Sequence, residues 1–121
     1  MSVGVLLAVG ALGGLGAIAR LLLDGATARR LGRDFPYGTL AVNLSGSLAL
    51  GLVVGAAAGG DAYRLAATGF LGAYTTFSTW MFESHRLAED GRSGVGALNV
   101  GAGLVLGIAA VWLGRRLGAG L

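Results

Sequence analysis

Four long runs without a charged side chain divide this sequence, and they constrain its fold more than any other feature. They cover residues 1–19, 35–60, 65–82 and 93–114. Each is about as long as the roughly 20 residues that an α-helix needs to cross the hydrocarbon core of a bilayer. We therefore predict an all-α membrane protein with a single four-helix transmembrane domain. This domain takes in residues 1–121, with predicted spans over about 3–23, 36–58, 63–84 and 94–114.

The composition also favours a membrane protein over a soluble one. Of the 121 residues, 55% are hydrophobic and only 12% are charged, whereas a soluble domain carries about 25% charged residues. All nine basic residues are arginines, and most lie where an apolar run ends, which is where a bilayer tolerates charge. We therefore expect membrane lipid as a partner and no nucleic acid, in spite of the net charge of +3.

Several kinds of chemistry are excluded by the residues that the chain lacks. It has no cysteine, and His85 is its only histidine, which argues against a metal site built from thiolates or several imidazoles. No nucleophile lies beside a base in the sequence, and no motif binds phosphate. We therefore expect that the protein is not an enzyme.

Glycine is abundant, at 24 residues, and three pairs of glycines have a four-residue spacing. Small residues at this spacing share one face of a helix and let two helix backbones approach closely in lipid. We therefore expect tight helix packing, within or between subunits, and an oligomer, because four such small helices enclose little by themselves. The pairs are Gly10/Gly14, Gly51/Gly55 and Gly103/Gly107.

The distribution of arginines gives only a shallow bias in membrane orientation. In a four-span arrangement, both termini share one side with Arg64, Arg115 and Arg116. The opposite side carries Arg29, Arg30, Arg33, Arg86 and Arg92. Three arginines against five is a weak signal under the positive-inside rule. The chain is thus compatible with insertion in both orientations, and an antiparallel dimer would follow if the two coexist.

Polar side chains in the second span lie on one helical face, because Thr39, Asn43 and Ser47 follow each other at four-residue spacing. Polar groups in hydrocarbon are costly unless they are paired, so each is a candidate functional residue. Asn43 stands out because its amide offers two donors and an acceptor. The spacing alone leaves two roles open, a hydrogen bond between helices and a functional site.

The third span predicts an interrupted helix. Residues 69–80 (GFLGAYTTFSTW) contain three threonines, a serine, two glycines and four aromatic residues. Such hydroxyl residues weaken a helix and replace its backbone hydrogen bonds. A break at this depth is tolerated only where freed carbonyls line a cavity or bind an ion. Phe77 and Trp80 project on one side, where their positive ring edges could face an anion or simply pack on other helices.

Two charged residues flank these segments. Arg20 closes the first apolar run, where it could snorkel to the headgroups or place a positive charge at the mouth of an anion path. Glu83 lies just past the aromatic pair, where it could pair with an arginine or cap the third span.

Three segments together resemble the CrcB/Fluc family of fluoride channels, and the similarity covers nearly the whole chain. The third-span motif is the most specific of the three. The first-span segment resembles a glycine–arginine signature of the family, and the second-span segment resembles its asparagine motif. The segments are residues 13–20 (GGLGAIAR), 38–47 (GTLAVNLSGS) and 69–79 (GFLGAYTTFST).

The resemblance implies a fluoride-selective channel in the microbial plasma membrane, a multi-pass protein that lets fluoride leave the cytoplasm passively and so gives fluoride resistance. It further implies an antiparallel, dual-topology dimer, formed as a homodimer or as a heterodimer with a second family member. A structural sodium ion would lie at the dimer centre, held by backbone carbonyls of Gly72 and Thr75.

The same resemblance implies a role for each residue of the fluoride path. Asn43 would contact fluoride, and Phe77 would offer its ring edge. Ser78 and Thr79 would supply hydroxyls, Trp80 would be the second aromatic of the pair, and Arg20 would line the vestibule.

This sequence departs from the family pattern in its aromatic pair and its fourth span. Trp80 replaces a phenylalanine, Asn99 stands where a tyrosine is usual, and Gly103 and Gly107 stand where serines often contribute. These changes remove donors from one pore wall, which would alter conductance or require a complementary partner subunit.

One alternative has the same size and topology, a proton-coupled cation exporter of the small multidrug-resistance type. That chemistry requires a carboxylate embedded in the first span. The first span here contains none, since Asp24 lies only at its end.

Overall fold

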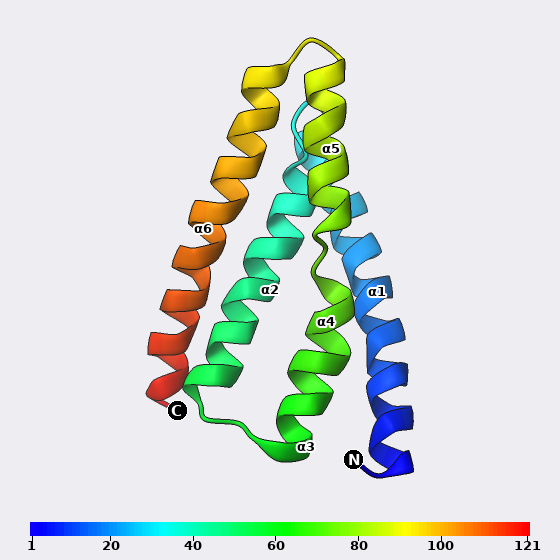
Figure 1. Cartoon of the computed structure of the whole chain (residues 1–121), viewed down its shortest axis with the longest axis vertical. Helices are drawn as coiled ribbons and strands as arrows, with labels where there is room; N and C mark the ends of the chain where they lie inside the picture. The colour runs from blue at the N-terminus through cyan, green and yellow to red at the C-terminus, as the bar shows by residue number, and fades with distance from the viewer.

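The computed structural model describes all residues from 1 to 121, and every regular element in it is helical (Figure 1). The prediction of an all-α protein is confirmed. The elements follow one another as α1 (Val3–Leu31), α2 (Tyr37–Gly55), α3 (Gly60–Tyr63), the π-helix η1 (Arg64–Leu71), α4 (Gly72–Tyr74), α5 (Ser78–Glu89) and α6 (Ser93–Ala119).

Three of these helices, α1, α2 and α6, are long and apolar enough to cross a membrane. The helices α1 and α6 are longer than the predicted spans. The first continues through Arg29 and Arg30 to Leu31, and the last continues through Arg115 and Arg116. Arginine is a good helix former, so the charge that ends an apolar run does not end the helix.

Residues 60–89 form helical pieces of a different kind. The elements α3, η1 and α4 join into one continuous helical stretch, in which η1 has the wider π-helical winding. The chain then leaves the helix over Thr75, Thr76 and Phe77 before α5 begins at Ser78. Figure 1 shows these pieces following one another along a single line beside α1 and α2.

The most extensive helix–helix packing is between α2 and α6, and it depends on glycine. A Cβ atom on Gly51 would lie 2.8 Å from the amide nitrogen of Arg115 and 3.0 Å from the Cα of Gly114. A Cβ atom on Gly114 would lie 3.0 Å from the amide nitrogen of Leu52. The two backbones therefore touch, as small-residue motifs allow in membrane helices.

Helix α1 approaches residues 60–89, the third segment, in a similar way. A Cβ atom on Gly16 would lie 3.1 Å from the carbonyl carbon of Phe70 and 3.2 Å from the amide nitrogen of Tyr74. The end of η1 and the short α4 therefore rest directly on the α1 backbone. This contact fixes the position of the interruption that follows Tyr74.

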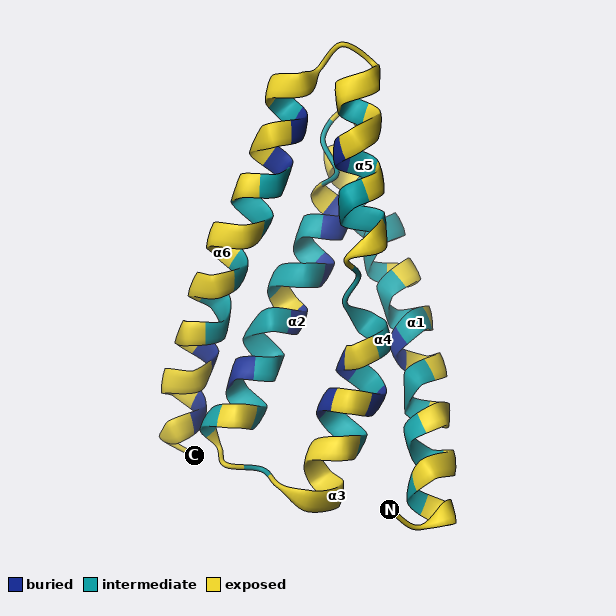
Figure 2. Cartoon of the chain, in the orientation of Figure 1, coloured by how far each residue is buried: buried dark blue, intermediate teal, exposed yellow.

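Few residues are buried within the single chain (Figure 2), and many large apolar side chains are exposed. Only 14 of the 121 residues are buried, and large side chains such as Leu22, Val105 and Ile108 are more than 60% exposed. The accessible surface is 7185 Å², whereas a compact monomer of this mass exposes about 6,000 Å². Such a surface requires lipid, further subunits or both.

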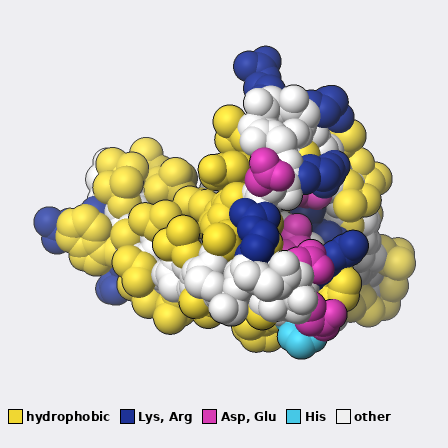
Figure 3. Space-filling model, turned by 90° about the horizontal axis from the view of Figure 1, so that it is seen from above, with side chains coloured by type: hydrophobic (Ala, Val, Ile, Leu, Met, Phe, Trp, Pro, Cys, Tyr) yellow, Lys and Arg dark blue, Asp and Glu magenta, His cyan; other side chains and the backbone are white.

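The two termini lie at the same end of the molecule (Figure 1). The opposite end carries the α1–α2 and α5–α6 connections. Figure 3 looks onto this end and shows arginine side chains gathered with acidic ones, while hydrophobic side chains cover the flanks. Charge is therefore concentrated at an end of the helices, as a membrane-spanning protein requires.

Candidate functional site

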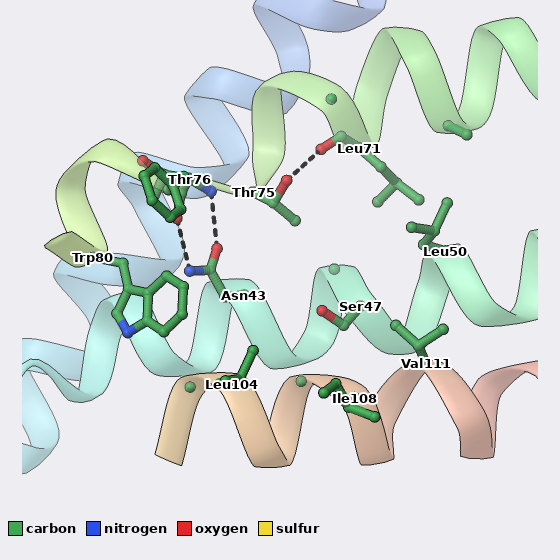
Figure 4. Close-up of a pocket in the computed structure, with 16 residues that line it drawn as sticks. Asn43, Ser47, Leu50, Leu71, Thr75, Thr76, Trp80, Leu104, Ile108 and Val111 are labelled. Carbon is green, nitrogen blue, oxygen red and sulfur yellow. Dashed lines mark hydrogen bonds between the residues drawn. The ribbon is translucent and has the colours of Figure 1, made fainter. Parts of the chain in front are cut away.

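An open groove of about 550 Å³ lies between α2, the third segment and α6 (Figure 4). Its walls are mostly apolar side chains and glycines. The polar side chains that line it come from α2 and from the interruption, and they are Asn43, Ser47, Thr75 and Thr76. Such a groove, apolar with a few convergent polar groups, has the composition of a binding site.

The side chain of Asn43 holds the interrupted segment, the non-helical residues 75–77, in place. Its Nδ2 donates to the carbonyl of Thr76, and its Oδ1 accepts from the amide of Thr76, both at 2.8 Å. The amide thus satisfies both backbone groups of a residue that lies outside any helix. The two bonds use one N–H and one lone pair of the oxygen, so the second Nδ2 hydrogen is left for another acceptor.

The interruption has further hydrogen bonds of its own. The Thr76 hydroxyl accepts from the backbone N–H of Thr79 at 3.2 Å, which caps the first turn of α5 as N-terminal hydroxyls commonly do. The amide and the hydroxyl of Thr75 both donate to the carbonyl of Leu71, each at 3.1 Å. The Thr76 hydroxyl therefore replaces one helical acceptor, while the Thr75 hydroxyl adds a second bond to a carbonyl that its own amide already reaches.

Two carbonyls beside the break have no hydrogen-bond donor within the chain. Because the Thr76 N–H is bonded to Asn43, it does not reach the carbonyl of Gly72, and no other group does. The carbonyl of Thr75 is likewise free of any donor, since the Thr79 N–H goes to Thr76. Both residues line the groove. Free carbonyls of an unwound membrane helix are the ligands that transporters offer to sodium, so these residues suit such an ion.

The two aromatic residues of the predicted path meet at one end of the groove. Phe77 is 71% exposed, and its ring meets the Trp80 ring edge-on, with centroids 5.8 Å apart and planes at 83°. The indole N–H of Trp80 donates to the carbonyl of Asn99 at 3.0 Å. The Phe77 ring is therefore supported on one side by Trp80 and uncovered on the other.

A second cavity, of about 530 Å³, lies beyond the break at the charged end of the molecule. Thr79 and Glu83 of α5 face it, together with Arg33, Arg86 and Arg92. Glu83 accepts a hydrogen bond from the hydroxyl of Thr39, which ties α5 to α2. Four of the predicted path residues thus lie along the two cavities, with Asn43, Phe77 and Trp80 at the groove and Thr79 at this second space.

Two predicted path residues line neither cavity. Ser78 is exposed at the start of α5. Arg20 points into the bundle, where its Nε donates to the carbonyl of Ala73 at 3.2 Å. A cation at the C-terminal end of a helix stabilises its unpaired carbonyls, so Arg20 supports the end of α4. The sequence had left open a snorkelling role or a place at an anion mouth.

Comparison with known proteins decides the family. The family model described as "CrcB-like protein, Camphor Resistance (CrcB)" matches residues 7–115. This chain belongs to the CrcB-like family. The membership expected from the three sequence segments is confirmed.

Relatives of this CrcB-like chain are similar over nearly their whole length. "Fluoride-specific ion channel FluC 2" of Mycobacterium tuberculosis is 52% identical over 116 residues, which cover 95% of this chain and 91% of that protein. "Fluoride-specific ion channel FluC" of Acidobacterium capsulatum is 47% identical, covering 89% and 91%. "Fluoride-specific ion channel FluC 1" of Symbiobacterium thermophilum is 42% identical, covering 93% and 95%.

The sequence analysis missed one polar network of this CrcB-like chain. Asn99 is 1% exposed, and its Nδ2 donates to the Ser84 hydroxyl at 2.8 Å. That hydroxyl in turn donates to the carbonyl of Trp80 at 2.8 Å. A lone asparagine in an apolar span was the available signal, but it was noted only as a departure from the family pattern.

Proposed function

We propose that this chain is one subunit of a fluoride-selective channel in a microbial plasma membrane, where passive fluoride efflux confers fluoride resistance. The proposal is supported by relatives that are named fluoride-specific ion channels and match almost the entire chain. The observation that carries it is the interrupted segment, held by Asn43 at a groove beside two free carbonyls. Relatives named as channels also agree with the expectation that the chain is not an enzyme.

The alternative of a proton-coupled cation exporter is abandoned. This alternative was based on the small size and the four predicted spans, and it would place the chain among proteins of the small multidrug-resistance type. Membership of the CrcB-like family removes that basis.

In the proposed membrane arrangement, residues 60–89 make a fourth crossing, interrupted at Thr75–Phe77. Their helical pieces run end to end beside α1 and α2 (Figure 1), which supports a crossing. Two copies would then pair in antiparallel orientation, which the shallow arginine bias permits. The uncovered apolar surface supports a second subunit, and the numbered names FluC 1 and FluC 2 among the relatives keep a heterodimer beside a homodimer.

Fluoride is small and strongly hydrated, so a channel must replace its water with donors that bind it weakly enough to release it. The free N–H of Asn43 and the uncovered edge of Phe77 would offer such contacts at the groove. The hydroxyls of Ser78 and Thr79 would continue the path toward the charged end, with Trp80 supporting Phe77. Arg20 would add positive charge from within the bundle, close to the break.

Gly72 and Thr75 would hold the structural sodium ion through their free carbonyls. The ion would supply a fixed positive charge near the path when it is bound. The chain itself keeps those carbonyls available, because Asn43 diverts the Thr76 N–H and the Thr76 hydroxyl diverts the Thr79 N–H.

The first test is fluoride efflux from liposomes that contain this chain alone, followed with a fluoride-sensing electrode. We expect fluoride to leave the liposomes while chloride, measured as the control, stays inside. Efflux of both anions would show that the channel is not selective for fluoride. If folded protein gives no efflux alone or with a second CrcB-like chain, the proposed function is wrong.

Sodium removal tests the role of the free carbonyls. After exhaustive exchange of sodium for a large organic cation, we expect most of the fluoride efflux to be lost, or the dimer to dissociate, because the carbonyls would face each other without a counter-charge. Gel filtration and the same efflux assay measure the two effects, and returning sodium is the control. Full efflux with an intact dimer in sodium-free medium would contradict the assignment of Gly72 and Thr75.

A further inference from the structure

The indole of Trp80 occupies the space that a side chain at position 103 would need. A Cβ atom built on Gly103 would lie 2.7 Å from the Cε2 and Nε1 atoms of Trp80 and 2.8 Å from its Cζ2. Real Cβ atoms do not approach other atoms so closely. Any residue larger than glycine at this position therefore displaces the indole.

The missing side chain also explains the hydrogen bond of the indole. Side chains on a helix point toward its N-terminus, over the preceding turn. A side chain at position 103 would thus cover the carbonyl of Asn99, one turn earlier. With Gly103 the carbonyl is open, and the indole N–H of Trp80 reaches it at 3.0 Å.

The side chain of Asn99 closes a circuit with the same tryptophan. Its Nδ2 donates to the Ser84 hydroxyl, and that hydroxyl donates to the Trp80 carbonyl, both at 2.8 Å. Asn99 and Ser84 are both buried. The ring of Trp80 is therefore bonded to Asn99 directly, and its backbone is linked to Asn99 through Ser84, with the Asn99–Ser84 bond in buried surroundings where such bonds are strong.

We propose that Trp80, Ser84, Asn99 and Gly103 form one interlocked unit, the indole clamp, which sets the position of the Phe77 ring at the edge of the groove. The edge-on contact between the two rings carries this effect, because Phe77 lies outside any helix and is otherwise largely uncovered. Trp80 is thus a positioning residue. The link to conduction rests on the proposed function, whereas the clamp itself does not.

The indole clamp links three departures from the family pattern, Trp80, Asn99 and Gly103, in one structural unit. Trp80 requires the space at Gly103, and its indole bonds to the backbone carbonyl of Asn99, while the Asn99 side chain reaches the Trp80 carbonyl through Ser84. Gly107 is not part of this unit, because a Cβ atom there would meet only the Ser47 hydroxyl, at 3.8 Å. The clamp therefore predicts that positions 80 and 103 depend on each other.

The test uses a Trp112→Phe background, in which Trp80 is the only tryptophan and reports its own surroundings. Gly103→Ser is expected to shift the Trp80 emission to longer wavelength, as the indole leaves its partner. It should also reduce fluoride efflux by about tenfold or more, which corresponds to about 1.4 kcal/mol. Gly101→Ser is the matched control on the same helix, since no atom lies within 4 Å of its Cβ position; it should change neither quantity.

The decisive variant is Trp80→Phe/Gly103→Ser, in which a smaller ring leaves space for the serine. We expect it to recover most of the efflux that Gly103→Ser loses, or the assembly if Gly103→Ser fails to assemble. Unchanged emission and efflux in Gly103→Ser would overturn the clamp, and so would a double variant that recovers neither efflux nor assembly. If the original chain conducts no fluoride, either alone or with a second CrcB-like chain, the proposed function fails, but the emission shift and the recovery of assembly still test the clamp.

Discussion

Replacement of Asn43 by alanine is expected to reduce fluoride efflux by about thirtyfold or more while the protein still assembles. The variant leaves the N–H and the carbonyl of Thr76 without their partner. An unsatisfied buried group costs about 1–3 kcal/mol, and because these two bonds are only part-buried we take the low end for each, which gives about 2 kcal/mol of lost preference for this conformation, or about thirtyfold. The liposome efflux assay measures the loss, and gel filtration checks assembly.

Ser45→Ala is the matched control for Asn43→Ala. Ser45 lies on the same helix, two residues further along, and its hydroxyl bonds to the Tyr74 hydroxyl at 2.8 Å. It lines neither cavity. The control removes a polar side chain from α2 but leaves the partner of Thr76 in place, so efflux should stay close to that of the original chain. Equal efflux in both variants would show that Asn43 does not shape the conducting groove.

The sequence singled out Asn43 as a candidate, but it could not choose between a hydrogen bond between helices and a functional contact. The structure shows the hydrogen bond, since the amide bonds to both backbone groups of Thr76. The functional contact stays a prediction, for which the second Nδ2 hydrogen is available. The partner lies 33 residues away. It offers an N–H and a carbonyl only because the chain is not helical there. The role of Asn43 therefore depends on the helix break at Thr76, which the four-residue spacing in the second span cannot reveal.

The glycine pairs show the same limit. All three have a four-residue spacing, yet Gly51 and Gly55 touch the backbone of α6, whereas Gly10 and Gly14 have no atom within 4 Å of their Cβ positions. The prediction of close helix packing is confirmed for Gly51 and Gly55. For Gly10 and Gly14 it stays a prediction, and it would concern contacts between subunits. Spacing identifies a face that can approach another helix, but the identity of that helix depends on the whole topology.

The sequence indicates where apolar stretches lie, but it does not show where the helices that contain them end. Charge-free runs mark where hydrocarbon can lie, but α1 continues as a helix past Asp24 to Leu31. In this longer helix, Asp24 faces the charged cavity. Hydropathy therefore locates the apolar part of a helix, while the helix end depends on local backbone features such as Gly32, whose φ of 82° stops α1.

Replacement of Gly51 by valine is expected to prevent assembly of most of the protein, which is the largest effect on stability that we predict. The added Cβ atom would lie 2.8 Å from the amide nitrogen of Arg115 and 3.0 Å from the Cα of Gly114, and it would also meet the carbonyl of Val111. These neighbours are backbone atoms, so no side-chain rotation can relieve the contact. Overpacking a core costs about 1–3 kcal/mol even where side chains can move, and here α2 and α6 must separate.

The yield of monodisperse protein in gel filtration measures this effect, with Gly101→Val as the control. Both variants place the same β-branched side chain in a long apolar helix, so their intrinsic helix penalties are similar. Position 101 has open space around its Cβ, whereas position 51 faces backbone. A large loss in Gly51→Val alone would show that the touching backbones of α2 and α6 stabilise the fold. Similar yields for both variants would instead show that α2 and α6 can separate at little cost, and the groove that they border would then have no fixed wall.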